Sequence, residues 1–365
     1  MQSLFSGIYK DKTVLVTGHT GFKGSWLCFW LKQMGAKVVG YSLEAPTNPN
    51  HFELLNLDIT SIKGNIKDLE HLNTVFQTYK PDIVFHLAAQ ALVKYSYENP
   101  IETYETNVMG TLKVFEASRI NNVKAIVNIT SDKAYENREW IWGYRENDPM
   151  GGYDPYSSSK GCADILTNSY RNSFFNIKDY KKTHNTLIAT CRAGNVIGGG
   201  DWAKDRLITD IMISVSIGKK VSIRNPKATR PWQHVLEPLS GYLHIGQKLL
   251  EEKVEFAEAW NFGPSDEGSI TVEEVVQNVK KHWDKIDYEI NKDPNQLHEA
   301  NLLKLDCSKA HILLKWKDVW DSETTFEKTV KWYKAYYENN KEILTQSDLE
   351  SYIADAKAKN IEWAR

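Results

Sequence analysis

Long hydrophobic runs are missing from this sequence. No stretch approaches the roughly 18 apolar residues of a membrane-spanning helix, and residues 1–13 lack the apolar core of a secretion signal. Cysteine is also scarce. The four residues have no C-x-x-C spacing, so neither a disulfide framework nor a cysteine zinc site is indicated: Cys28, Cys162, Cys191 and Cys307. We therefore expect a cytoplasmic protein with reduced cysteines.

An excess of charge of one sign is missing as well. The 45 Lys and Arg residues nearly balance 47 Asp and Glu, and no long basic run is present, which argues against nucleic acid as the main partner. The composition that remains, 41% hydrophobic and 25% charged, is typical of a soluble globular protein. A length of 365 residues allows two domains, or one enlarged α/β domain with an appendage.

Short β-branched runs alternate with helical patterns in the first half of the chain. Runs apolar enough to be buried on both faces, separated by helices, are typical of a parallel sheet with helices on both sides. We expect strands at residues 13–16, 37–41, 83–87, 125–130 and 187–191, and helices at 24–34, 100–120 and 155–175. The predicted fold class is therefore α/β, with a Rossmann-like doubly wound parallel sheet.

The pattern loosens after Cys191. Residues 194–200 are glycine-rich and 224–238 carry three prolines, as in loops that shape a ligand crevice at the carboxyl ends of strands. A further strand is expected at 259–262 and a helix at 326–343. Another helix is expected at 271–283, because Thr271 can cap it with Glu274 three residues on.

A glycine motif, Gly18-His19-Thr20-Gly21-Phe22-Lys23-Gly24, lies between the first expected strand and the first expected helix. Such glycines permit a tight turn and let the helix N-terminus face a pyrophosphate. Three glycines at this spacing could occur in any loop, but this position favours a dinucleotide. The second strand ends in Tyr41-Ser42-Leu43-Glu44, with no Arg or Lys to meet a 2′-phosphate, so NAD is favoured over NADP. The acid that usually ends this strand is displaced or absent.

A Y-x-x-x-K motif occurs three times, at Tyr156/Lys160, Tyr288/Lys292 and Tyr337/Lys341. Only the first opens a helix after a buried-looking strand and a polar loop, and on a helix a spacing of four places the ammonium one turn from the phenol. We expect that cation to lower the pKa of Tyr156 towards that of a usable general base. A surface pair on an exposed helix is the alternative, and it fits the two later copies.

With these motifs, the sequence resembles the extended short-chain dehydrogenases/reductases from about residue 12 to residue 340. Further matches are His86-Leu87-Ala88-Ala89-Gln90 and Asn107-Val108-Met109-Gly110-Thr111, whereas Asn65-Ile66 departs from the family's Asp-Ile. The resemblance implies an NAD site made by Gly18, Thr20, Gly21, Phe22, Lys23, Gly24, Ser42, Asn65, Ile66, Leu87, Ala88, Ala89, Gln90, Asn107, Tyr156 and Lys160. It also implies a homodimer that pairs helices 99–119 and 155–175 into a bundle.

The strand at 125–130 is followed by Ser131-Asp132-Lys133. An acid and an amine beside a hydroxyl resemble the sugar-nucleotide 4,6-dehydratases, and Lys in the second place is similar to the CDP-glucose 4,6-dehydratase subgroup. Two long runs, 192–202 and 230–238, are also similar to that subgroup. A solvated, salt-linked turn is the alternative reading of Asp132 and Lys133.

This resemblance implies the conversion of CDP-glucose to its 4-keto-6-deoxy sugar with NAD. Tyr156 as phenolate takes the proton of the 4-hydroxyl, Ser131 bonds the C4 oxygen, and Lys160 grips the ribose of NAD. Lys133 is then the base at C5, and Asp132 is the acid at the 6-hydroxyl, which requires both groups to have perturbed pKa values. The implied diphosphate ligands are Asn195, Arg206 and Arg230, although Arg206 could instead form a surface ion pair beside Asp205. No metal site is expected.

Three rival functions stay open. A UDP-N-acetylhexosamine 4,6-dehydratase that inverts C5 can also carry Asp-Lys, a nucleotide-sugar 4-epimerase would have little use for the pair, and a non-catalytic NAD-binding regulator is compatible with the fold.

The domains we predict are an NAD-binding domain at 1–193, with 234–263 returning to it, and a sugar-nucleotide lobe at 194–233 and 264–345. A helical or frayed tail is expected at 346–365.

Overall fold

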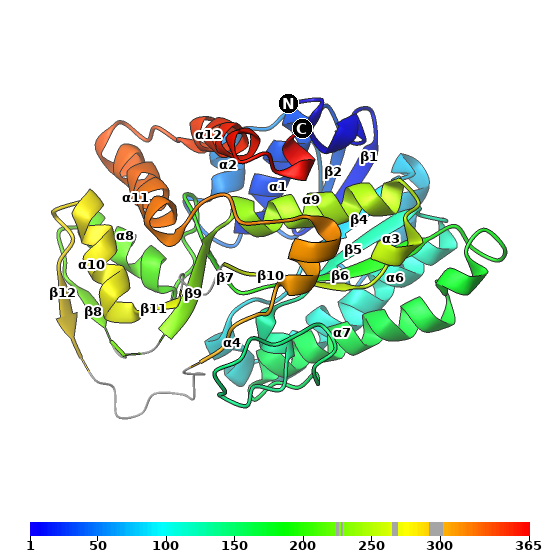
Figure 1. The fold of residues 1–365 in the computed structure, drawn as a ribbon, viewed down its shortest axis with the longest axis horizontal. Helices are drawn as coiled ribbons and strands as arrows, with labels where there is room; N and C mark the ends of the chain where they lie inside the picture. Colours follow the sequence, from blue (N-terminus) through cyan, green and yellow to red (C-terminus); the bar gives the residue numbers. More distant parts are fainter. Residues whose placement is uncertain (224–225, 228, 265–268, 292–301) are drawn as a thin grey trace.

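The computed structural model describes residues 1–223, 226–227, 229–264, 269–291 and 302–365. The side chains of Arg230 and Ser269 lie outside that description. Figure 1 shows a central parallel sheet flanked by helices, with a smaller lobe that carries α8, Leu207–Ser216, and α10, Val272–His282, beside it. In the described residues no helix has the length and apolar character needed to cross a bilayer.

Seven parallel strands form the central sheet, in the order β10-β6-β5-β4-β1-β2-β3. The chain leaves β1 towards β2 and β3 on one side, then returns beside β1 at β4 and continues outward, so the strand order reverses between β1 and β4. Ligands of doubly wound sheets bind outside the carboxyl ends of the strands at such a reversal. The strands are β1 Thr13–Thr17, β2 Lys37–Ser42, β3 Thr60–Lys63, β4 Ile83–His86, β5 Ala125–Ile129, β6 Leu187–Ala193 and β10 Ala259–Phe262. The predicted fold class is confirmed.

Helices bury both faces of this sheet, because its strands are apolar on both sides. One core joins the sheet to α1, Phe22–Gln33, and α9, Leu236–Leu250, and the other joins it to α3, Leu69–Tyr79, α6, Thr111–Ile120, and α7, Pro155–Ser173. The two ends of the chain lie side by side on the first core (Figure 1), where Phe5 stacks on Trp363 with ring centroids 5.2 Å apart.

The single helix expected at 100–120 is interrupted. Residues Pro100–Tyr104 form α5, Glu105–Gly110 form a π-helical turn, η2, and only then does α6 begin. A π turn inserts one extra residue into a helix and often marks a functional site. Here it places Asn107 beneath the loop that follows β4, where the Asn107 amide bonds both backbone groups of Gln90.

The smaller lobe has its own core, which packs α8, α10 and α11, Ser322–Glu338, against two short sheets. The sheets are β11-β9-β7, from Ser269–Thr271, Thr229–His234 and Asn195–Ile197, and β12-β8, from Tyr288–Ile290 and Val221–Ile223. The predicted cap of α10 is confirmed, because Thr271 and Glu274 form a reciprocal capping box. Residues Thr345–Ala358 form α12, whose buried side chains Leu349, Tyr352, Ile353 and Ala356 pack into the first core, so this end is helical and not frayed.

Candidate active site

A cavity of about 1690 Å³ opens at the carboxyl ends of β1, β4, β5 and β6 and extends to the smaller lobe. Single-ligand pockets typically measure about 300–1,000 Å³, so this cavity has room for a dinucleotide and a nucleotide sugar together. It is lined by every predicted catalytic residue and by every predicted cofactor residue except Asn107. Asn107 is buried behind the wall, where its amide also donates to Ser159 Oγ at 2.8 Å, so its effect on a cofactor is indirect.

The glycine loop has the geometry that a pyrophosphate requires. Gly18 has φ +75°, a conformation that residues with a Cβ rarely adopt, and a Cβ at Gly24 would lie 2.1 Å from the Gly18 oxygen. Helix α1 therefore begins directly against the turn. Gly21 precedes the helix and has no side chain that could cap the first backbone N–H groups of α1. Residues 21–24 line the cavity, so these N–H groups are available to a ligand there. These residues fit a dinucleotide phosphate.

The end of β2 and the loop after β3 form the other side of the cofactor half. Ser42 lies at the end of β2, and its hydroxyl is 2.9 Å from Thr20 Oγ1. Asn65 accepts a hydrogen bond from Lys67 N at its side-chain oxygen, and its backbone oxygen accepts one from the Tyr41 hydroxyl. The Asn65 side-chain oxygen is thus occupied by its own loop, which leaves its amide nitrogen for a ligand.

Ser131, Asp132 and Lys133 lie on a tight turn directly after β5. The turn continues into the 3₁₀ helix η3, Asp132–Ala134, which Ser131 caps by accepting from the Lys133 backbone N–H at 3.3 Å. Ser131 Oγ also donates to Asp132 Oδ1 at 2.9 Å. Burial raises the pKa of Asp132, against the opposing charge of Lys133, so this carboxyl holds its proton more readily than an exposed one does.

Tyr156 and Lys160 lie in the first turns of α7, which Asp154 caps by accepting from Ser157 N. The Lys133 ammonium lies 6.0 Å from the centroid of the Tyr156 ring, so the predicted base and the predicted phenol face the same space. Of the other two motif copies, Lys341 lies beyond the end of α11 and Lys292 lies outside the described residues.

The expected effect of Lys160 on Tyr156 is wrong. Burial raises the pKa of Tyr156 to about 12, and the groups that oppose this rise are Ser131, through a hydrogen bond, and the charge of Arg206. The Lys160 ammonium instead donates to the Ile129 carbonyl at 3.5 Å, and burial lowers its own pKa to about 8. The spacing of one helical turn determines the position of the Lys160 Cα, but not the direction of its long side chain.

The predicted diphosphate ligands come from the lobe side of the cavity. Asn195 on β7 and Arg206 before α8 both line the wall, whereas the side chain of Arg230 lies outside the described residues. Arg206 Nη1 donates to Asp201 Oδ2 at 2.5 Å, and it is Lys94 that pairs with Asp205. Arg206 thus does form an ion pair, as in the alternative considered for it, but with Asp201 and not with Asp205. The Lys94–Asp205 pair joins helix α4, Val93–Glu98, to the lobe.

Sequence reasoning missed two groups of this site. The Lys94–Asp205 pair joins residues 111 positions apart, and a polar network behind the turn joins Tyr135, Asp164 and Arg192. Arg192 stands at the start of one of the long runs that resemble the dehydratases, but no local spacing identifies its partners.

The fold, the glycine turn and the Tyr156/Lys160 pair define an extended short-chain dehydrogenase/reductase. Within that class, residues 15–331 match the GDP-mannose 4,6 dehydratase family, and the chain belongs to this family of nucleotide-sugar dehydratases. A CDP-glucose 4,6-dehydratase of Salmonella typhimurium is 55% identical over 331 residues, which cover 90% of this chain and 92% of that protein. The resemblance predicted from the motifs is confirmed.

Two solved structures share the fold. A UDP-glucose 4-epimerase of Thermotoga maritima, with UDP-glucose, is 22% identical with a TM-score of 0.75, and the match covers 89% of this chain and 100% of that one. A dTDP-glucose 4,6-dehydratase of Bacillus anthracis, in complex with NAD, is 23% identical with a TM-score of 0.73 over 90% and 98% of the two chains. Because epimerases and dehydratases share this fold, the choice between them rests on the site.

Proposed function

We propose that this protein is a CDP-glucose 4,6-dehydratase that converts CDP-D-glucose to CDP-4-keto-6-deoxy-D-glucose with NAD. The observation that carries the proposal is the placement of Asp132 and Lys133 on one turn of the cavity wall, facing Tyr156. A 4-epimerase needs only the hydroxyl and phenol of such a site. The 55% identity to a protein named for this activity supports the same choice.

Bound NAD would supply the acceptor for the hydride of sugar C4 and the donor of a hydride to C6. It would be held by the Gly18–Gly24 turn, by the walls at Ser42, Asn65 and Ile66, and by Ala88 and Ala89 after β4. Lys160 would hold the ribose, and its weak bond to the Ile129 carbonyl supports this assignment. Glu44 also lines this half and is unsuited to a 2′-phosphate, which favours NAD over NADP.

Tyr156 would accept the first proton of the reaction. As phenolate it takes the proton of the 4-hydroxyl, while Ser131 bonds the C4 oxygen, a role that a hydroxyl fills because it can donate or accept. The pKa of about 12 means that the phenolate must be stabilised when substrate binds, and Ser131 and Arg206 already act in that direction.

The residues of the Asp132–Lys133 turn would carry out the elimination of water. Once C4 is a ketone, the Lys133 side chain acts as the base that takes the C5 proton, Asp132 gives its proton to the 6-hydroxyl, and water leaves as the C5–C6 double bond forms. Lys133 then returns its proton to C5 as C6 is reduced. Burial favours Asp132 for this task, because it raises the pKa of the carboxyl, the direction that a proton donor requires.

The smaller lobe would bind the rest of the substrate. Asn195 and Arg206 reach the cavity from this side and suit a diphosphate, and we assign Arg230 on β9 to the same group from its place in the sequence. We assign residues 1–193 and 234–263 to the NAD-binding domain and residues 194–233 and 264–345 to the sugar-nucleotide lobe, with one correction. Side chains between residues 307 and 320 pack into the core of the central sheet and not into that of the lobe, so this segment belongs to the first domain.

We further propose a homodimer through the helices at 99–119 and 155–175. Large apolar side chains are exposed there, with Ile101 76%, Ile165 58% and Met109 47% accessible. An apolar hollow of about 430 Å³ separates α5 and η2 from Cys162 on α7. Exposed apolar surface of this kind marks protein interfaces.

A cytoplasmic location stays a prediction, and the four free cysteines support it.

The test is incubation of the purified protein with CDP-glucose and, separately, with UDP-N-acetylglucosamine, followed by mass measurement of the products. We expect CDP-glucose to lose one water. Loss of water from the UDP sugar alone would replace the substrate assignment, an unchanged mass with altered stereochemistry would indicate an epimerase, and no reaction would indicate a non-catalytic protein.

A further inference from the structure

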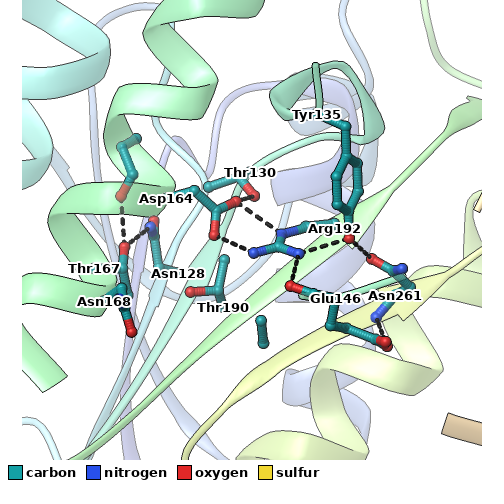
Figure 2. Close-up of polar contacts among 12 residues, drawn as sticks. Asn128, Thr130, Tyr135, Glu146, Asp164, Thr167, Asn168, Thr190, Arg192 and Asn261 are labelled. Atoms are coloured by element: carbon teal, nitrogen blue, oxygen red, sulfur yellow. Dashed lines mark hydrogen bonds and ion pairs between the residues drawn. The ribbon is translucent and has the colours of Figure 1, made fainter. Parts of the chain in front are cut away.

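A buried ion pair lies directly behind the wall that carries the proposed acid and base. Arg192 on β6 bonds Asp164 on α7 in a fork, with Nη2 to Oδ1 at 2.7 Å and Nε to Oδ2 at 3.0 Å. The two side chains are only 5% and 3% exposed. Figure 2 shows the carboxylate and the guanidinium facing each other between the helix and the sheet.

This pair contacts both ends of the turn that carries Asp132 and Lys133. At the start of the turn, Thr130 Oγ1 donates to Asp164 Oδ2 at 2.7 Å. At its end, Arg192 Nη1 donates to the Tyr135 hydroxyl at 2.6 Å, and the guanidinium carbon lies 4.8 Å from the centroid of that ring. We call Thr130, Asp164, Arg192 and Tyr135 the clamp.

Tyr135 is held from a further side, by the strand at the edge of the sheet. Its hydroxyl donates to Asn261 Oδ1 at 2.8 Å, and Asn261 Nδ2 in turn donates to the Tyr144 carbonyl at 2.8 Å. Figure 2 shows this chain running from Arg192 through Tyr135 to Asn261. The phenol therefore has fixed partners on both sides, and the backbone that follows Lys133 is anchored to β6 and β10.

Lys133 itself depends on this backbone. Its ammonium makes no hydrogen bond or ion pair with any residue in the described parts of the chain, so its place beside the Tyr156 ring follows from where the turn lies. Asp132 is held by Ser131, a member of the same turn. A shift of the turn would therefore move acid and base together, and displacements of about 1 Å can cost on the order of 100-fold in rate.

We propose that Arg192, Asp164 and Tyr135 are positioning residues that hold the Asp132–Lys133 turn in register with the sugar, and that water elimination depends on them more than C4 oxidation does. The proposal rests on the proposed dehydratase function. A buried ion pair is in general weak support for stability and is often replaceable by apolar side chains. Its use here is geometric, because its polar atoms bond both ends of a catalytic turn.

The decisive variant is Tyr135→Phe, which keeps the ring and removes only the hydroxyl that joins Arg192 to Asn261. We expect loss of water from CDP-glucose to slow at least ten-fold and C4 oxidation to slow less than three-fold, so that the absorbance of reduced cofactor builds up on mixing. Arg192→Lys, which keeps the charge but not the fork, should give the same signature with a larger loss.

Tyr144→Phe is the matched control. Tyr144 stacks on Tyr135 with ring centroids 5.2 Å apart and bonds Asn137 through its hydroxyl, but no bond joins that hydroxyl to Arg192. It should turn over like the wild type. If Tyr135→Phe turns over like the wild type, or slows both half-reactions equally, the clamp has no positioning role.

Hydrogen exchange supplies a readout that does not depend on activity. The amides of Ala134 and Tyr135 bond within the turn, and we expect both to exchange faster in Tyr135→Phe than in Tyr144→Phe. Equal exchange in the two variants would overturn the clamp. A wild type that leaves CDP-glucose intact would overturn the proposed function instead, and the exchange result would still decide whether the clamp holds the turn.

Discussion

Asp132 and Tyr156 lie in one buried site, and burial has opposite consequences for their proposed roles. Burial raises the pKa of the Asp132 carboxyl, which favours its proposed role of protonating a leaving hydroxyl. A phenol taken out of water retains its proton too, which opposes its use as a base, and the pKa of Tyr156 rises to about 12. The proposed role of Tyr156 as a base therefore depends on groups that stabilise its phenolate, such as Ser131 and Arg206.

Replacing Lys133 by Met tests the elimination step at this scale. Without the amine, C4 oxidation should proceed and water loss should fall by about 10²–10⁴-fold, the usual contribution of a general base. Rapid mixing with CDP-glucose should show reduced cofactor accumulating in place of product. Lys178→Met, at an exposed site outside the cavity, is the control, and unchanged turnover of Lys133→Met would remove Lys133 from the mechanism.

Replacing Tyr156 by Phe tests the first proton transfer. The variant should bind CDP-glucose as the wild type does, because the ring remains, but should form reduced cofactor about 10²–10⁴-fold more slowly. Calorimetric titration and stopped-flow absorbance measure the two quantities. Tyr337→Phe, in a later copy of the same motif, should behave as the wild type. Normal formation of reduced cofactor by Tyr156→Phe would exclude it as the base.

Among the elements, α9 and α12 are joined by one buried carboxyl. Glu237 on α9 accepts hydrogen bonds from the backbone N–H groups of Val319 and Trp320 and from the Tyr352 hydroxyl of α12. Burial raises the pKa of Glu237 to about 8 despite these bonds. The carboxyl therefore holds a proton in the folded protein at pH values where an unfolded chain has released it.

This linkage predicts a contribution of Glu237 to stability that falls as pH rises. The unfolded glutamate titrates near pH 4.3. Between that value and about pH 8 Glu237 is protonated more in the folded state than in the unfolded state, so its contribution to the free energy of unfolding decreases with pH across this window. We expect a decrease above about 1.4 kcal/mol, the equivalent of one pKa unit. Glu237→Gln should flatten this part of the curve in denaturant titrations at several pH values, while exposed Glu255→Gln should not, and equal slopes would contradict the linkage.

At the scale of the whole molecule, the apolar surface of α5, η2 and α7 determines the expected assembly. A charge at Ile101 or Ile165 would be buried unpaired in the proposed helix bundle, which is costly. Ile101→Glu and Ile165→Glu should therefore shift the protein from dimer to monomer in sedimentation velocity. Ile312→Glu, at an exposed site away from these helices, is the control. A wild-type protein that sediments as a monomer would refute the dimer.

Several features followed from local sequence alone. The glycine turn, the strands and the cap of α10 depend on φ requirements, alternation and neighbours a few residues away. The π turn at Glu105–Gly110 did not follow, because it is a single turn between two helices and no residue spacing in the sequence marks it. The direction of the Lys160 side chain did not follow either, since spacing places only its Cα.

What the sequence by itself determined is the order of elements, the glycine turn and the residue types of the Ser131–Lys133 turn, because each is encoded within about one element's length. Only the tertiary structure decided what lies behind that turn. Arg192 meets Asp164 across 28 positions and Tyr135 across 57, and the burial that raises the pKa of Tyr156 is produced by several elements at once. Contacts between distant residues and their removal from water are properties of the packed chain.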